Sequence, residues 1–176
     1  MCFRMKESNA IRGPGNELLQ FINLPPCSNP KKLKCGKGNR FNIKWKVCSA
    51  ERLNVPNNSF DFYTISFGLR NAKNINKSLK EAHRVLKSGG RFLCLEFSKI
   101  ENNNLEILYK NYSKLIPKIG EIVVGEKKPY EYLVKSIEKF VNQDQLLELM
   151  KKNNFIKCTY KNLSGGIVAI HTGWKV

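Results

Sequence analysis

The stretch from Asn57 to Asn71, with the sequence NNSFDFYTISFGLRN, constrains the fold of this chain more than any other segment. Turn-forming residues open it, and the apolar run from Phe60 to Phe67, rich in β-branched and aromatic residues, ends at Gly68. A short continuous apolar run between a turn and a glycine is typical of a strand buried on both faces of a parallel sheet. Ligands of open α/β sheets bind just beyond the carboxyl ends of the strands. We therefore expect a functional site between Ser66 and Asn71.

Strand-like and helix-like segments alternate along the rest of the chain. Periodicity predicts strands over residues 42–48, 91–98, 155–162 and 167–175, and helices over residues 75–86, 105–116, 130–140 and 143–152. Residues 87–90 are expected to end the first helix and Pro117 the second, so that residues 118–128 form a loop. The alternation predicts an α/β fold with a doubly wound parallel sheet. The short connection at residues 163–166 makes the last two strands an antiparallel hairpin.

Residues 1–41 are predicted to be an irregular N-terminal segment, and residues 42–176 to form the folded domain. The segment is broken by prolines and glycines, and its one helical run, from Glu17 to Leu24, is too short to be stable alone. Its two glycine pairs, at residues 13 and 15 and at residues 36 and 38, do not qualify as phosphate loops. Such a loop needs a strand before it and a helix after it.

Composition leaves the partner open. The chain has 176 residues and a net charge of +17, which raises nucleic acid or an anionic membrane as partners, although the lysines are scattered as on an ordinary solvated surface. The six cysteines show no CxxC pair and no Cys/His spacing typical of a metal site, and no secretory segment precedes them. These features predict a reduced intracellular protein without a metal. No apolar run approaches the roughly 18 residues of a transmembrane helix.

Four segments of the chain form a recognisable set: NNSFDFYTISFGLRN, EAHRVLKSGGRFLCLEFSK, PYEYLVKSIEKF and LSGGIVAIHTGWKV. Taken together, they resemble the ubiquinone/menaquinone biosynthesis C-methyltransferases, which are class I S-adenosylmethionine-dependent methyltransferases. The resemblance is collinear over residues 42–176, which it identifies as the C-terminal part of a methyltransferase domain, and it leaves residues 1–41 unmatched. It implies a Rossmann-like sheet of order 3-2-1-4-5-7-6 in which the seventh strand is antiparallel, in agreement with the predicted hairpin.

The resemblance also implies roles for individual residues. Ser49 and Ala50 match residues that hold the adenine end of S-adenosyl-L-methionine, and Ser66 matches another cofactor contact. Arg70 matches an arginine that helps to deprotonate the quinol hydroxyl. Such a role is chemically sound, because a fixed cation stabilises the phenolate whose ring carbon attacks the methyl group. The alternative for Arg70 is a salt bridge or loop anchor.

Two further titratable residues lie on predicted strands. Glu96 has two open interpretations, since it could face the cofactor cleft or pair with a lysine. His171 is predicted to be an ordinary core or surface histidine with satisfied hydrogen bonds.

The departures from the family pattern lie upstream of residue 42. Members carry a glycine-rich loop after their first strand and an acidic residue after their second, and residues 1–41 supply neither. We therefore expect a methyltransferase sheet that lacks its first two strands. The central strand would then be an unpaired apolar edge, and the strand at residues 42–48 would have no neighbour in its usual place.

The resemblance implies S-adenosylmethionine-dependent C-methylation of a polyprenyl benzoquinol or naphthoquinol. The apolar region at residues 105–140 would cap the ring and tail. The enzyme would be cytoplasmic, peripheral to the inner face of the membrane, and associated with other quinone-biosynthesis enzymes. Two alternatives remain: an inactive fragment of that enzyme without the cofactor loop, and a basic nucleic-acid-binding module, for which the sequence shows no recognition motif.

Overall fold

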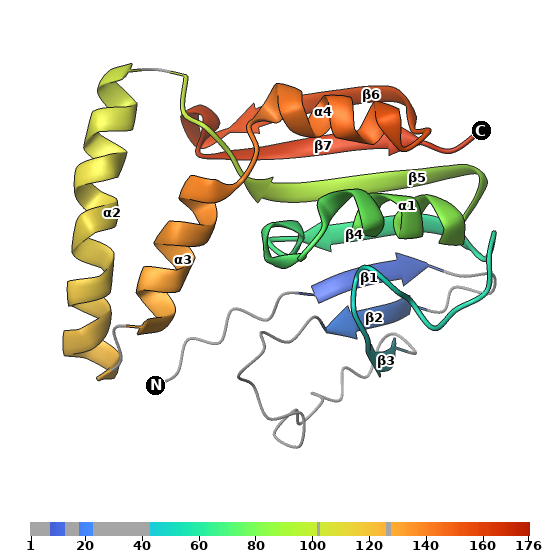
Figure 1. Cartoon of the computed structure of the whole chain (residues 1–176), viewed down its shortest axis with the longest axis horizontal. Coiled ribbons are helices and arrows are strands. Elements are labelled where there is room, and N and C mark those ends of the chain that lie inside the picture. The colour runs from blue at the N-terminus through green and yellow to red at the C-terminus, as the bar shows by residue number, and fades with distance from the viewer. Residues whose placement is uncertain (1–7, 13–17, 23–42, 102, 126–127) are drawn as a thin grey trace.

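Seven strands form one sheet in the computed structural model, which describes residues 8–12, 18–22, 43–101, 103–125 and 128–176. The strands are β1 (Ser8–Arg12), β2 (Leu18–Ile22), β3 (Ile43–Val47), β4 (Phe60–Ser66), β5 (Leu86–Phe97), β6 (Ile156–Leu163) and β7 (Val168–Trp174). Their order across the sheet is β3-β2-β1-β4-β5-β7-β6 (Figure 1). This order confirms the predicted Rossmann-like fold class, and the antiparallel pair β6 and β7 confirms the terminal hairpin.

Among the described strands, β1 and β7 run opposite to the other five. β4 and β5 are parallel, as are β2 and β3, whereas β7 is antiparallel to both of its neighbours. β1 is antiparallel to β2 on one side and to β4 on the other. The sheet therefore contains a second reversed strand, which the family topology does not predict.

The prediction that two strands are missing, leaving β4 as an exposed edge, is wrong. β1 pairs with β4 from Asn9 opposite Ile65 to Arg12 opposite Phe62, and β3 has β2 as its parallel neighbour. An unpaired strand edge satisfies its backbone groups with any extended segment of suitable length. Two five-residue strands from the N-terminal segment meet that need, and the prolines and glycines around them concealed both runs from the periodicity analysis.

Helix boundaries agree with the predictions at α1 and α4. α1 (Ile75–Val85) starts at Asn74, whose side chain accepts a hydrogen bond from the Lys77 N–H at 3.1 Å. α4 (Gln143–Lys152) spans the predicted residues and begins with a capping box. The predicted turn at residues 87–90 and the predicted strand start at residue 91 are wrong, because the chain enters β5 directly at Leu86. Gly89, with φ of +79°, lies within that strand and provides the left-handed conformation expected there.

The second helix is longer than predicted. α2 (Asn103–Val124) continues through Pro117, so the predicted loop at residues 118–128 is mostly helical. Proline removes one backbone donor, and the apolar repeat continues past it at Ile119 and Ile122, which favours the helix. The α2 helix ends at Gly125, whose φ is +75° and whose N–H donates to the Glu121 carbonyl oxygen at 3.0 Å.

The core lies on one face of the sheet. α1 and α4 cover that face (Figure 1) and bury side chains from β4, β5 and both helices, including Tyr63, Ile65, Leu79, Phe92, Leu146 and Met150. Residues of the opposite face are only half-buried, and Phe62 is 42% exposed. The prediction that the central strand is buried on both faces is therefore wrong for the described residues. Alternate side chains of a strand point to opposite faces, and helices cover only one of these.

The remaining helices lie beyond the ends of the strands. α3 (Lys128–Lys139) contacts the 3₁₀ helix η2 (Leu69–Asn71) that follows β4, and α2 packs on α3 (Figure 1). A second 3₁₀ turn, η3 (Ser164–Gly166), joins β6 to β7. Within the described ranges, none of the helices is both long enough and apolar enough to cross a membrane.

Candidate active site

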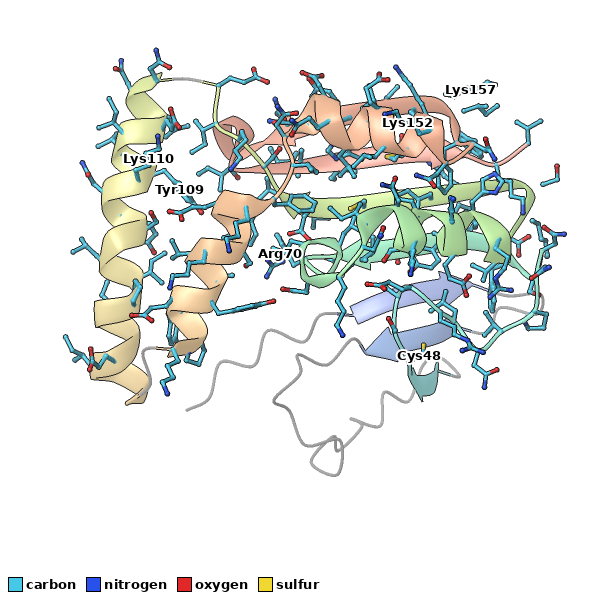
Figure 2. All side chains as sticks on the ribbon, in the orientation of Figure 1. Cys48, Arg70, Tyr109, Lys110, Lys152 and Lys157 are labelled. Carbon is cyan, nitrogen blue, oxygen red and sulfur yellow. The ribbon has the colours of Figure 1, made fainter. Side chains whose placement is uncertain are left out.

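A buried ion pair lies at the carboxyl end of β4, where the sequence predicts a site. Arg70, on η2, lies at the end of the sheet nearest α3 (Figure 2). Its Nη1 is 2.9 Å from Oε1 of Glu96 on β5, and the two side chains are only 3% and 1% exposed. A buried arginine and a buried carboxylate stabilise each other's charge, because removing one partner leaves an uncompensated charge in the protein interior.

Further contacts fix both members of the pair. Glu96 also accepts hydrogen bonds from the backbone N–H groups of Arg70 at 3.2 Å and of Phe97 at 3.0 Å. Arg70 donates to the carbonyl oxygen of Phe67, and its guanidinium carbon lies 5.3 Å from the centroid of the Phe97 ring. The salt bridge or loop anchor that the sequence left open for Arg70 is therefore present, and its catalytic role stays a prediction.

The backbone at Phe67 is strained. Its φ is +53°, in the left-handed region that bulky side chains rarely adopt. The Phe67 N–H continues the sheet by donating to the Leu95 carbonyl oxygen at 2.8 Å, and its ring packs 4.9 Å from that of Phe97. Left-handed backbone of this kind persists only where the surroundings hold it, and it concentrates at functional sites. The hydrogen bond from Arg70 to the Phe67 carbonyl oxygen helps to maintain this backbone conformation.

Electrostatics at the pair follow from burial. Burial raises the pKa of the Glu96 carboxyl, while Arg70 and the two backbone N–H groups act in the opposite direction. The alternative that Glu96 pairs with a lysine is wrong, because its partner is an arginine on the neighbouring loop, whereas the alternative that it faces the cofactor cleft stays a prediction.

The predicted cofactor residues lie at the same edge of the sheet. Ser66 ends β4, and Ser49 and Ala50 follow β3, which runs in the same direction. Glu51 connects the loop that follows β3 to the start of α1, because its Oε1 accepts a hydrogen bond from the Asn74 N–H at 2.9 Å. Ala50 is buried and Ser49 is exposed. Across the residues described, no hydrogen bond joins Ser49 or Ala50 to Ser66, and the cofactor roles of these residues stay predictions.

Contacts from α3 complete the surroundings of the loop, and the sequence analysis missed them. The Tyr132 hydroxyl donates to Asn71 Oδ1 at 2.8 Å, next to Arg70. At the other end of the helix, Lys99 Nζ donates to the Glu138 carbonyl oxygen at 2.8 Å. The motif PYEYLVKSIEKF pointed to this helix, but which of its side chains meets the loop depends on the packing of segments about 60 residues apart in the chain.

The cofactor half of the site fits the described residues only in part. Arg12, the last residue of β1, pairs with Phe62 near the start of β4, so the chain leaves β1 at the edge opposite Ser66. Among the described elements, β2 is the next one after β1. A dinucleotide-type loop needs a strand that ends at the ligand edge and leads into a helix. The glycine pairs at residues 13 and 15 and at residues 36 and 38 lie outside the described residues.

Two other features are structural. His171 is 2% exposed, and its Nε2 is 3.0 Å from the Gln143 carbonyl oxygen, which confirms a core histidine; burial lowers its pKa. The prediction that its hydrogen bonds are satisfied is wrong for Nδ1, which is buried without a partner among the described residues. Among the described residues, no group of histidine, cysteine and acidic side chains is arranged to hold a metal ion. An open cavity of about 680 Å³ lies beside α1 and is lined by Arg52, Leu53, Asn54, Val55, Glu81 and Arg84. It adjoins the predicted cofactor residue Ser49, whose carbonyl oxygen accepts a hydrogen bond from the Arg52 N–H at 3.1 Å.

Sheet order, terminal hairpin and a polar cluster at the carboxyl edge define a class I methyltransferase-like protein. The sequence profile described as the ubiE/COQ5 methyltransferase family matches residues 27–175, and the chain belongs to this family. The match begins inside the segment predicted to lack family resemblance, and the domain boundary at residue 42 stays a prediction. Family membership favours the methyltransferase interpretation over the nucleic-acid-binding alternative.

Relatives from Rickettsia support the assignment. The chain is 48% identical over 176 residues to the ubiquinone/menaquinone biosynthesis C-methyltransferase UbiE of Rickettsia akari, covering 98% of this chain and 71% of that protein. It is 55% identical over 136 residues to UbiE of Rickettsia bellii, covering 77% of this chain. The chain spans 55% of the length of this second relative.

Solved structures confirm the fold. A SAM-dependent methyltransferase from Thermotoga maritima has a TM-score of 0.54 at 21% identity, covering 77% of this chain and 65% of that chain. Phosphoethanolamine N-methyltransferase 2 of Haemonchus contortus, in complex with S-adenosyl-L-methionine, has a TM-score of 0.51 at 14% identity, covering 76% and 37%. The [4+2]-cyclase SpnF matches with a TM-score of 0.53 at 17% identity, covering 76% and 57%, so the fold alone does not fix the reaction.

Proposed function

We propose that this chain carries out S-adenosylmethionine-dependent C-methylation of a polyprenyl benzoquinol or naphthoquinol in ubiquinone or menaquinone biosynthesis. The observation that carries the proposal is the family match, which runs through the loop holding Arg70 and Glu96 at the carboxyl edge of β4. The Rickettsia relatives that bear this function in their names are about half identical to the chain. A ligand-binding edge with a buried charged cluster is where an α/β enzyme of this class would act.

Each half of the site has its own residues. S-adenosylmethionine supplies an electrophilic methyl group, and Ser49, Ala50 and Ser66 would hold it on the β3 and β4 side. On the acceptor side, Arg70 would favour the ionised quinol hydroxyl as a fixed cation. Because its side chain is only 3% exposed, contact with a quinol oxygen requires the surroundings of Arg70 to open.

A specific observation favours the second candidate, an inactive fragment. β1 is antiparallel to β4, so its last residue, Arg12, lies at the edge opposite the predicted cofactor residue Ser66. Backbone must approach the cofactor closely in this class of site, which normally requires glycines at the end of the first strand. A chain without that half of the site would retain the fold and the acceptor loop while transferring methyl groups slowly or not at all.

The proposed location is the cytoplasmic face of the membrane, together with other quinone-biosynthesis enzymes. A polyprenyl tail partitions into lipid, so an enzyme that methylates its head group gains by working at the interface. The net charge of +17 supports attraction to anionic head groups.

Transfer of a labelled methyl group from S-adenosylmethionine to a reduced polyprenyl benzoquinol tests the proposal. Arg70→Lys should reduce turnover by about a hundredfold, the usual loss when one transition-state donor is removed. Arg91→Lys is the matched control, because Arg91 also stacks on an aromatic ring, 5.1 Å from the Trp174 centroid, and lies at the far end of β5 from Glu96.

Equal turnover in Arg70→Lys and Arg91→Lys would remove Arg70 from the mechanism. No transfer by the unmodified chain, under conditions in which UbiE of Rickettsia akari transfers the label, would favour the inactive fragment.

A further inference from the structure

One face of α2 exposes large apolar side chains in a regular pattern. Five of them form what we term the α2 stripe, with exposed fractions of 49% to 85%: Leu108, Tyr112, Leu115, Ile119 and Ile122. They follow one another at intervals of four, three, four and three residues, which places them along one side of a helix. Scattered exposed apolar residues are ordinary, but a contiguous row of this length marks an interaction surface.

The α2 stripe is not the surface by which α2 joins the protein. α2 packs on α3, and Tyr109, on the side of α2 toward α3 (Figure 2), is half-buried. Ser113 is buried, and its hydroxyl donates to the Lys110 carbonyl oxygen at 2.9 Å. The helix stands apart from the sheet at one end of the molecule (Figure 1), so its outer side is open to a large partner.

Charge identifies the partner. The α2 stripe contains no charged residue, whereas the whole chain carries +17. Lysines occupy positions 110, 114 and 118 of α2, at four-residue intervals that follow a line beside the apolar one. Apolar residues on one side and basic residues along the flank are typical of a helix that lies in the interface of an anionic bilayer. The Lys110 side chain is 64% exposed, with its Nζ 2.7 Å from Glu106 Oε1, and an exposed lysine stem of this kind is long enough to reach the head groups.

A second copy of the chain fits less well. The α2 stripe covers 15 residues, from Leu108 to Ile122, or about 22 Å of helix, which is about two heptads. Sustained coiled-coil pairing is indicated by three to four heptads with complementary flanking charges. Two copies would also bring together bodies that each carry +17, and like charges oppose association.

We propose that the α2 stripe inserts into the interfacial region of an anionic membrane. The inference rests on the proposed function in one respect, because a lipid-soluble substrate gives the docking its use. It names the surface that would make the contact, and a membrane-binding measurement tests it whether or not the chain transfers methyl groups.

Vesicle flotation with the full chain provides the test. Phosphatidylcholine vesicles are compared with vesicles that also contain phosphatidylglycerol, at low and high salt. The double variant Leu115→Gln with Ile122→Gln should lower the partition coefficient for anionic vesicles by at least about tenfold, since two buried aliphatic side chains are lost. A control with the same number of changes is Ile107→Gln with Ile156→Gln, which alters exposed isoleucines outside the α2 stripe and should bind like the parent chain.

A spectroscopic variant covers the case in which the double variant loses helix content by circular dichroism. Tyr112→Trp should show a blue shift on adding anionic vesicles, together with quenching by lipids brominated on the acyl chain. Sedimentation velocity of the parent chain without lipid reports self-association.

Binding that needs phosphatidylglycerol, weakens with salt and is lost only in the α2-stripe variant supports the proposal. Three results would overturn it: no binding by the parent chain, equal binding by both double variants, or a dimer that the α2-stripe variant abolishes in place of vesicle binding. Vesicle binding without methyl transfer would leave the inference standing and count against the proposed function alone.

Discussion

The loop after β4 and the helix α2 differ in which kind of side chain they bury and which they expose. In the loop, a charged arginine and glutamate are almost completely buried and held by backbone groups. On α2, large apolar side chains face outward with 49% to 85% of their surface exposed. Each arrangement reverses the usual distribution of polar and apolar residues. The charged groups of the loop are satisfied within the protein, whereas α2 leaves its apolar surface available to a partner.

Breaking the ion pair should have the largest effect on this contrast. Arg70→Met leaves Glu96 buried without its charge partner, which should lower the free energy of unfolding by about 3–5 kcal/mol. Adding Glu96→Gln to that variant removes the stranded charge and should recover about 2 kcal/mol. Chemical denaturation of the three proteins measures both differences. A double variant no more stable than Arg70→Met would show that the charge of Glu96 is not what makes the single change costly.

Changing the strained residue should have a smaller effect. Phe67→Ala and Phe67→Gly both remove the ring contact with Phe97, but only glycine adopts the left-handed conformation without strain. Phe67→Gly should therefore be more stable than Phe67→Ala by about 1–2 kcal/mol in thermal or chemical unfolding. Equal stabilities would mean that the backbone at residue 67 relaxes and that Arg70 does not hold it.

Titration of the buried histidine sharpens the comparison on the sheet side. Burial lowers the pKa of His171 in the folded protein. As the pH falls below about 6.5, the unfolded chain therefore binds more protons than the folded one, and the free energy of unfolding decreases by up to about 1.4 kcal/mol for each pH unit. His171→Gln should flatten this dependence. His83→Gln is the control for the only other histidine, which is less buried, and it should flatten the curve less. If His83→Gln flattened the curve more than His171→Gln, the pH dependence of stability would come mainly from His83 on α1.

The smallest effect is expected on α2. Leu115→Gln replaces an exposed apolar side chain by a good helix former, so without lipid the free energy of unfolding should stay within about 0.5 kcal/mol of the parent value. Chemical denaturation without vesicles measures it. A loss of 2 kcal/mol or more would mean that the residue is covered within the protein in solution, and the contrast between loop and helix would fail.

The sequence predicted the C-terminal part of the fold well, because its signals are local. Asn74 caps its helix as expected, α4 has its predicted span, and the short connection at residues 163–166 gives the expected hairpin. The prediction that Pro117 ends the second helix was wrong, because the amphipathic pattern that continues past it outweighs the loss of one backbone donor. β1 and β2 were missed because each is five residues long and gains its stability from pairing with distant strands.

The candidate site divides in the same way. Its position at the end of the Phe60–Ser66 strand could be predicted from an apolar run that ends at a glycine, whereas the role of Arg70 was implied by the family resemblance. The glutamate that holds Arg70 lies 26 residues away, and the tyrosine that holds Asn71 lies 61 residues away. Strand alternation does not show which partner a buried carboxylate will meet, because that depends on the register between β4 and β5.

We propose that the β3 and β4 edge of this chain binds S-adenosylmethionine, the methyl donor of its family. Isothermal titration calorimetry with S-adenosylmethionine measures this binding, with UbiE of Rickettsia akari as the positive control. We expect saturable binding by this chain, weaker than binding by the relative, because β1 is antiparallel to β4 and ends at the edge opposite Ser66. If this chain gave no saturable heat while the relative bound under the same conditions, the edge would not be a cofactor site.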